Sequence, residues 1–275
     1  MPALHDAAQS LLDLLFPPRC VACRRGGAVL CSACRATIRS PQPPLCAHCG
    51  QSLALLPPGR ATAMCPACAG EHGPQALTAL YAASVYDGAA RQAIHALKYA
   101  GRRRLAQPLG DLLAIEARRV DVRPDLIVPV PRHAGRLRER GYNQAALLAC
   151  RCAARLGVPC RADLLARVCA TPPQVGLSLV ERRANVREAF ALAEGAGQSL
   201  AGKRVLLIDD VATTGSTLDA AAAALRLAAP AAILGMAVSR PDLADGAPDR
   251  DALPLAAARW ASAGRPFGRG QRGRA

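Results

Sequence analysis

The sequence predicts an α/β protein in which a mostly parallel sheet with flanking helices follows a small N-terminal metal-binding module. Short apolar runs at 126–130, 205–208 and 233–238 have the length of buried parallel strands and alternate with segments of helical periodicity. Upstream of these runs, eight cysteines fall in four Cys-x-x-Cys pairs. The 275 residues give room for a domain with a substantial core and one smaller module.

The composition limits the classes of function. Hydrophobic residues make up 51% of the chain, which excludes a wholly disordered protein. A charge or a proline interrupts every apolar run before it reaches membrane-spanning length, so we expect no membrane span. The net charge of +15 could attract a polyanion, yet only Lys98 and Lys203 among the 35 basic residues are lysines. Such a bias is typical of a GC-rich genome, and the charge alone is weak evidence for a polyanion partner.

Residues 4–16 predict a short amphipathic helix that ends before Pro17 and Pro18. The helix carries Asp6 and Asp13 and lacks the basic region and cleavage site of an export signal. We expect its leucines to dock on the body of the protein, with contact to a membrane surface as the alternative. The chain is therefore expected in the cytoplasm, where cysteines stay reduced and tend to bind metal.

The four cysteine pairs predict two structural zinc ions. A gap of two residues lets both thiolates face one ion, and two such pairs complete a tetrahedral four-sulfur site with no open position. The simplest assignment joins the first pair with the second and the third with the fourth, although the spacing also permits interleaving. A disulfide framework is the alternative. The predicted ligands are Cys20, Cys23, Cys31, Cys34, Cys46, Cys49, Cys65 and Cys68.

Other residues near or beyond these pairs are not expected to bind zinc. His48 lies inside the third pair and could replace a cysteine, but it is interpreted as a bystander. The remaining cysteines lack the paired spacing and are interpreted as core or surface residues. They are Cys150, Cys152, Cys160 and Cys169.

After the cysteine pairs, regular elements begin. A β-type segment at 76–85 and a turn at 86–88 come first, and the predicted helices span 89–99, 105–119, 143–156 and 216–228. Ligands of such sheets bind beyond the carboxyl ends of the strands. The shifts in composition divide the chain into a zinc module, an α/β domain and a flexible basic tail, at residues 1–74, 75–240 and 241–275.

The segment 205–218, with the sequence VLLIDDVATTGSTL, carries the strongest functional signal. A buried strand leads to two adjacent carboxylates, Asp209 and Asp210, and then to a loop of small residues that opens a helix. Backbone N–H groups and hydroxyls at a helix N-terminus suit a phosphate, and the carboxylates can bind ribose hydroxyls or a hydrated Mg²⁺. The pattern thus indicates a ribose 5-phosphate site. It lacks the lysine of an ATP-binding P-loop, and an ordinary strand–helix turn is the alternative.

This segment resembles the phosphoribosyl pyrophosphate (PRPP) signature of type I phosphoribosyltransferases. The resemblance implies a phosphoribosyltransferase fold, with Asp209 and Asp210 on the ribose 2- and 3-hydroxyls. It also implies a set of residues that cradles the 5-phosphate. These residues are Thr213, Thr214, Gly215, Ser216 and Thr217.

A second segment, LIVPVPRH at 126–133 followed by GRLRERGYNQ at 135–144, resembles the ComF family, also described as GntX-like. The resemblance implies that the basic loop after this strand meets pyrophosphate, because guanidinium groups fit phosphate oxygens. A solvated basic turn before a helix is the alternative. The candidate pyrophosphate ligands are Arg132, His133, Arg136 and Arg140.

A third segment, TPPQVGLS at 171–178 with ERRANV at 181–186, resembles a flap that covers the substrate in related enzymes. The resemblance implies that Gln174, Arg183 and Asn185 contact the ligand, and that closure excludes water. An ordinary surface segment is the alternative. The family resemblance covers nearly the whole chain and ends near Pro241.

Two functions are compatible with these observations. The first is a Mg²⁺-dependent phosphoribosyltransferase, a glycosyltransferase that releases pyrophosphate from PRPP and uses an unidentified acceptor. The second, implied by the ComF resemblance, is an accessory protein that handles single-stranded DNA in competence, together with the DNA-uptake machinery. In that case PRPP would regulate the protein or its site would be vestigial. The sequence leaves the acceptor and the oligomeric state open.

Overall fold

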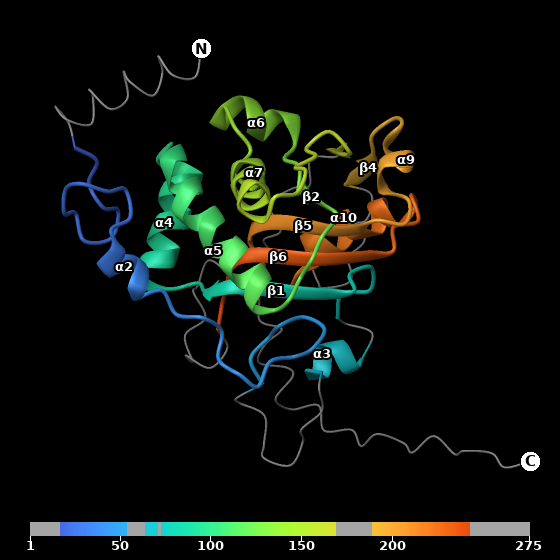
Figure 1. Ribbon diagram of the computed structural model, residues 1–275, viewed down its shortest axis with the longest axis horizontal. Coiled ribbons are helices and arrows are strands. Elements are labelled where there is room, and N and C mark those ends of the chain that lie inside the picture. Colours follow the sequence, from blue (N-terminus) through green and yellow to red (C-terminus); the bar gives the residue numbers. More distant parts are fainter. Residues whose placement is uncertain (1–16, 54–63, 71–72, 169–188, 243–275) are drawn as a thin grey trace, which may run out of the picture.

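The computed structural model describes residues 17–53, 64–70, 73–168 and 189–242 and contains a four-stranded parallel sheet (Figure 1). The strands are ordered β1-β6-β5-β2 and all three neighbouring pairs are parallel. They span Ala79–Val85 (β1), Leu126–Pro129 (β2), Arg204–Val211 (β5) and Ala232–Arg240 (β6). The predicted α/β fold is confirmed.

Both faces of the sheet are covered, as a parallel sheet requires. In β5, Leu206 and Ile208 point into one apolar cluster while Val205 and Leu207 point into the other. The first cluster is closed by α4 (Gly88–Tyr99), α5 (Ala106–Arg119) and α7 (Gln144–Leu156). The second is closed by α10 (Ser216–Arg226), α9 (Ala196–Leu200) and the hairpin of β3 (Leu165–Arg167) and β4 (Phe190–Leu192).

Most predicted elements occur close to their expected bounds, and the differences have physical causes. The basic segment expected as a loop after β2 instead forms a short helix, α6 (Ala134–Arg140), because the His133 ring accepts a hydrogen bond from the Gly135 N–H and caps it. The elements β3, β4 and α9 were not predicted, since three to five residues are too few to show a period. In addition, β5 continues through both carboxylates to Val211.

The zinc module packs against the sheet. Its helix α2 (Ser32–Ala36) lies beside α4 (Figure 1). Residues 39–48, which come before the short helix α3 (Pro66–Ala69), run along the outer edge of β1. There the Leu80 N–H donates to the His48 carbonyl (2.7 Å) and the Val85 N–H to the Arg39 carbonyl (2.8 Å). The module therefore satisfies backbone groups that an edge strand would otherwise leave unpaired.

Glycine is required where the module meets β1. Gly50 has a φ of +66°, and a Cβ there would lie 2.6 Å from the Leu80 carbonyl oxygen. Any other side chain would be strained and would push the module away from the strand. The close contact therefore depends on this residue.

Within the described ranges, no helix is long and apolar enough to cross a membrane. The predicted helix at 4–16 and the tail from 243 lie outside the described residues. The proposed boundaries at 74 and 240 stay predictions.

Candidate functional site

The two adjacent carboxylates lie near the carboxyl end of β5, where successive side chains point to opposite faces of the sheet. Asp210 is buried, at 4% exposure, and forms ion pairs with Lys98 Nζ (2.8 Å) and with Arg132 Nη2 (3.4 Å). Lys98 comes from the last turn of α4, and Arg132 follows β2. Burial opposes the charge of Lys98, but the Asp210 carboxylate outweighs this effect and raises the pKa of the lysine.

Asp209 is in a different electrostatic environment. Its removal from water, followed by the negative charge of Asp210, raises the pKa of Asp209 to about 7, although Lys98 and Arg132 oppose the shift. One of its oxygens, Oδ1, accepts the Asp210 N–H (2.8 Å). The site therefore joins one carboxylate paired with two cations to a second whose pKa is raised close to neutral pH.

The predicted phosphate loop connects β5 to the N-terminus of α10. Gly215 is buried with a φ of +80°, and a Cβ there would lie 2.8 Å from Leu80 Cδ2, so only glycine fits. The Thr214 hydroxyl is 2.7 Å from the Ser216 hydroxyl and accepts the Ser216 N–H (3.3 Å). Thr213 and Thr214 are exposed and Thr217 is half-buried at the start of α10. The loop is compact and open to a ligand, with the positive end of the helix dipole behind it.

The predicted pyrophosphate ligands do not all converge. Arg132 reaches Asp210, whereas the His133 ring is used as the cap of α6. Arg136 is exposed on α6, and the Arg140 guanidinium lies over the Tyr99 ring, 4.7 Å from its centroid. Their assignment to pyrophosphate stays a prediction. The flap residues Gln174, Arg183 and Asn185 lie outside the described residues.

Two basic residues at the site were missed from the sequence. Lys98 could have been noticed because the chain has so few lysines. Arg167, in β3, had no signal of its own; burial and then the neighbouring Arg136 charge lower its pKa, while Asp209 opposes the shift. Like charges gathered in this way favour an anion between them.

The eight predicted zinc ligands form two clusters, each with its four sulfur atoms within 4.8 Å of one another. The outer cluster comprises Cys20, Cys23, Cys31 and Cys34, and the inner cluster comprises Cys46, Cys49, Cys65 and Cys68. The sequential pairing is therefore confirmed. Backbone N–H groups donate to the sulfur atoms, as from Cys31 to Cys20 Sγ (3.4 Å) and from Cys65 to Cys46 Sγ (3.3 Å). Four converging thiols with such donors fit a structural zinc ion.

His48 and the remaining described cysteines behave as the sequence indicated. His48 is no part of either cluster, and its ring Nε2 donates to the Pro74 carbonyl (2.7 Å). Cys152 is buried in the core, while Cys150 is exposed with its sulfur 3.0 Å from that of Cys160. Cys169 lies outside the described residues.

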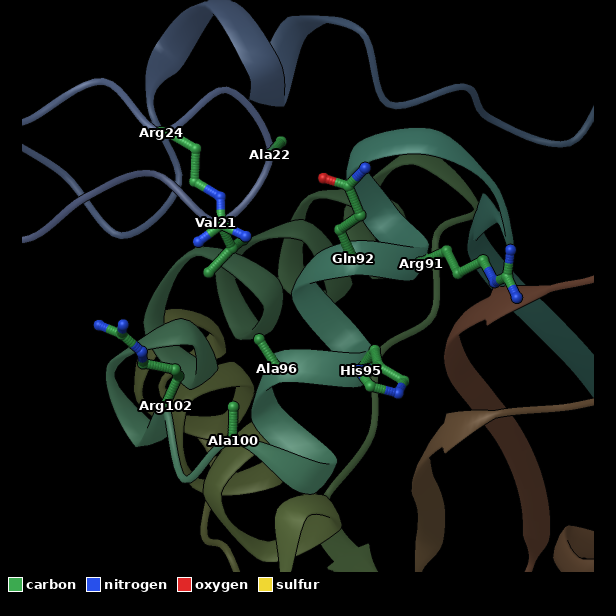
Figure 2. A pocket seen from close by; sticks show the side chains of 9 residues that line it. All are labelled: Val21, Ala22, Arg24, Arg91, Gln92, His95, Ala96, Ala100 and Arg102. Atoms are coloured by element: carbon green, nitrogen blue, oxygen red, sulfur yellow. The ribbon is translucent and has the colours of Figure 1, made fainter.

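A basic groove lies between residues 21–24 of the zinc module and the exposed side of α4 (Figure 2). Its volume is about 490 Å³, and no acidic residue lines it. Arginines line it from three segments: Arg24 next to Cys23, Arg91 from α4 and Arg102 from the chain that follows α4. The side chains of Arg91 and Arg102 point to opposite sides in Figure 2. The other lining residues are Val21, Ala22, Gln92, His95, Ala96 and Ala100.

Comparisons with known proteins agree with both halves of this arrangement. Residues 11–69 match the model of the double zinc ribbon domain, and residues 119–253 match that of the phosphoribosyl transferase domain. The chain is thus a phosphoribosyltransferase-type α/β domain joined to a double zinc ribbon. A solved structure of glutamine PRPP amidotransferase from B. subtilis is a distant likeness that covers 48% of this chain and 26% of that one, at 20% identity and a TM-score of 0.33.

Sequence relatives give the family. Competence protein F of Haemophilus influenzae is 32% identical over 222 residues, which cover 77% of this chain and 92% of that protein. DNA utilization protein YhgH is 34% identical in Salmonella typhi and 32% in Escherichia coli K12, in both cases over 74% of this chain and 89% of the relative. The chain belongs to the ComF family, which includes these proteins.

Proposed function

We propose that this protein binds PRPP with Mg²⁺ and transfers its phosphoribosyl group to an acceptor. In this reaction the bond from C1 of the ribose to pyrophosphate breaks, a bond from C1 to the acceptor forms, and pyrophosphate leaves. The observation that carries the proposal is the position of the Asp209–Asp210 pair next to the phosphate loop, with Lys98 and Arg132 beside it. Phosphate binding at one end and hydroxyl binding at the other match a ribose 5-phosphate.

Each residue has a role that follows from its chemistry. The loop from Thr213 to Thr217 would donate N–H and hydroxyl groups to the 5-phosphate, as at other helix N-termini. Asp209 and Asp210 would accept hydrogen bonds from the ribose hydroxyls. Bound Mg²⁺ would neutralise the charge of the leaving pyrophosphate.

The cations define the other end of the proposed site. Lys98 and Arg132 are paired with Asp210, so a ligand with phosphate oxygens would join an existing charge network instead of meeting isolated cations. Arg136, Arg140 and His133 are proposed to support pyrophosphate from α6. Gln174, Arg183 and Asn185 would close over the ligand, which would prevent hydrolysis of PRPP by excluding water.

Ligand binding tests the site directly. PRPP with Mg²⁺ should raise the melting temperature of the intact protein, because a ligand that binds only the folded state stabilises it. Asp210→Asn should remove this shift, whereas the control Asp163→Asn should keep it, since Asp163 is an exposed acid paired with Arg161. No shift with the unaltered protein would refute the ligand assignment.

Turnover is a separate question with its own measurement. Pyrophosphate release from PRPP should be followed across a panel of bases, amines and oligonucleotides. Release with one acceptor and not with the others would establish the transferase and its substrate. Bound PRPP without release across the panel would instead favour a regulatory ligand.

A second function, the handling of single-stranded DNA, is favoured by the basic groove in Figure 2. Arginines from three segments with no acid among them suit the phosphates of a nucleic acid strand. The printed names of the relatives, competence protein F and DNA utilization protein YhgH, point in the same direction. PRPP binding would then accompany a role with the DNA-uptake machinery.

This second function predicts a salt-dependent contact. Anisotropy of a labelled single-stranded oligonucleotide should show binding that weakens steeply as salt rises, because bound counterions are released from the strand. Arg24→Ala with Arg102→Ala should weaken it, whereas Arg123→Ala, which alters an exposed arginine paired with Asp121, should not. Equal binding by all variants would exclude the groove as the contact.

A further inference from the structure

We propose that the inner zinc cluster holds the phosphate loop in its binding geometry, with Arg240 as the positioning residue that joins them. Zinc at the inner cluster would then control the affinity for PRPP, while zinc at the outer cluster would not. The inference rests on the proposed function for its ligand, but the mechanical link that it requires can be measured without any ligand.

Arg240 connects the two parts with a single side chain. It is the last residue of β6 and is 5% exposed. Its Nη1 donates to the carbonyl of the zinc ligand Cys49, and its Nη2 donates to the carbonyl of Thr213 (3.3 Å) in the phosphate loop. The planar guanidinium fixes the direction of both bonds. A displacement of the Cys49 backbone would therefore alter the support of the loop.

A second connection runs through the chain that leaves the inner cluster. Backbone N–H groups of Gln75, Ala76 and Leu77 all donate to Asp219 Oδ1, at 2.8, 2.7 and 3.3 Å. Asp219 is in the first turn of α10, and its own N–H donates to the Gly215 carbonyl (2.9 Å). This carboxylate thus attaches the start of α10 to the segment that follows the inner cluster, by charge-assisted hydrogen bonds.

Two more contacts complete the connection on the side of the cluster. The His48 ring, between Cys46 and Cys49, donates to the Pro74 carbonyl (2.7 Å), and the His48 carbonyl accepts the Leu80 N–H. Leu80 and Pro74 lie against Gly215: a Cβ added there would be 2.8 Å from Leu80 Cδ2 and 3.6 Å from Pro74 Cγ. The floor of the phosphate loop is therefore made of residues that the inner cluster holds in place.

Zinc at the inner cluster would stabilise the residues that contact the phosphate loop. Small zinc modules fold on binding the metal, since the ion replaces a hydrophobic core that they lack. Without zinc at the inner cluster, the Cys49 carbonyl and the His48 ring would lose their fixed positions and the loop would lose its floor. The coupling is reciprocal, so PRPP bound at the loop should also raise the affinity of the inner cluster for zinc.

The test compares a matched pair of ligand variants in the full chain. Cys68→Ser removes a half-buried ligand of the inner cluster, and Cys34→Ser removes the half-buried ligand at the corresponding place in the outer cluster. Each variant should lose about one zinc ion. We expect Cys68→Ser to weaken Mg²⁺·PRPP binding by about tenfold or more, and Cys34→Ser to leave it within about twofold, by isothermal titration calorimetry.

Amide hydrogen exchange measures the coupling between the inner cluster and the phosphate loop without PRPP. Exchange at residues 212–216 should accelerate in Cys68→Ser and stay unchanged in Cys34→Ser. If Cys68→Ser does not fold, Arg240→Met answers the question, because it keeps the cluster and removes only the connection. Arg204→Met is its control, since Arg204 is at the other end of the neighbouring strand and pairs with Asp125.

The outcomes are distinct. Faster exchange at 212–216 in Arg240→Met, but not in Arg204→Met, supports the inference. Unchanged exchange in Arg240→Met overturns it, as does equal loss of PRPP affinity in the inner and outer variants. Failure of the unaltered protein to bind PRPP would refute the proposed function, and the exchange data would still decide the mechanical link.

Discussion

The two zinc clusters have the same local structure but different surroundings. In each, a backbone bridge brackets the first cysteine pair, Arg19 with Gly26 in the outer cluster and Leu45 with Ser52 in the inner one. In each, the third cysteine precedes a short helix, α2 or α3. In each, one sulfur–sulfur distance between the pairs is 3.7 Å. The sequence repeat thus produces a structural repeat.

The two clusters differ in their burial and in the elements that they contact. Cys23 of the outer cluster is exposed, whereas the first three ligands of the inner cluster, Cys46, Cys49 and Cys65, are 2–6% exposed. The outer cluster packs on α4, while the inner one lies against β1 and is joined to the phosphate loop. The two clusters therefore have the same ligand set but different neighbours: the outer one contacts a helix, and the inner one contacts β1 and, through Arg240, the loop that follows β5.

The largest expected effect is on stability. Cys65→Ser should lower the free energy of unfolding of the whole domain by more than about 3 kcal/mol, because zinc binding supplies folding energy to a module packed on the sheet. Cys31→Ser, at the equivalent position, should mainly unfold the outer module. Urea denaturation with zinc analysis measures both. Equal losses in the two variants would contradict the distinction between inner and outer clusters.

The next largest loss of stability is expected for Asp219, which contacts the segment that follows the inner cluster. Asp219→Ala leaves three backbone N–H groups without their acceptor and should cost about 2–3 kcal/mol. Asp163→Ala, which breaks an exposed pair with Arg161, should cost less than about 1 kcal/mol. Thermal unfolding with the two variants side by side gives the comparison. Similar small costs would show that the inner connection is weak.

The pH dependence of stability should come from Asp209 in β5, on the side of the inner cluster. Because the pKa of Asp209 is raised to about 7 from 3.8, the folded state holds a proton that the unfolded chain has released, so stability should fall as pH rises between these values. The side chain of Asp209→Asn is neutral at every pH in this range, so the variant avoids the cost of a buried charge. It should be more stable than the unaltered protein, most of all above about pH 7. Urea unfolding at a series of pH values tests this. Parallel profiles for the two proteins would disprove the assignment.

The smallest expected effect is at the chain between the two clusters. Arg39 forms an exposed ion pair with Asp87, which precedes α4. Arg39→Ala should cost less than about 1 kcal/mol, because solvent screens such pairs. Differential scanning calorimetry would detect a larger change, and a loss comparable to that of Asp219→Ala would show that this segment contributes as much as the inner connection.

Local patterns predicted much of this molecule. Cysteine spacing predicted both clusters, and the apolar run before Asp209 and Asp210 predicted β5 and the loop after it, because each depends on neighbouring residues. Arg240 and Asp219 could not be identified in this way. Arg240 is 191 residues from Cys49 and 27 from Thr213, and Asp219 is 142–144 residues from residues 75–77. Only the folded sheet brings these partners together. For the same reason, Lys98 was not assigned to Asp210.

The hydrogen bonds from β1 to the zinc module have a consequence for the newly made chain. The N–H groups of Leu80 and Val85 donate to the carbonyls of His48 and Arg39. A zinc module that folds only on binding metal would leave these groups unpaired until the metal arrives, and β1 would present an open edge. Open edges recruit strands from other chains and lead to aggregation. We therefore expect zinc supply to determine how much newly synthesised protein reaches the native fold and how much is lost to aggregates.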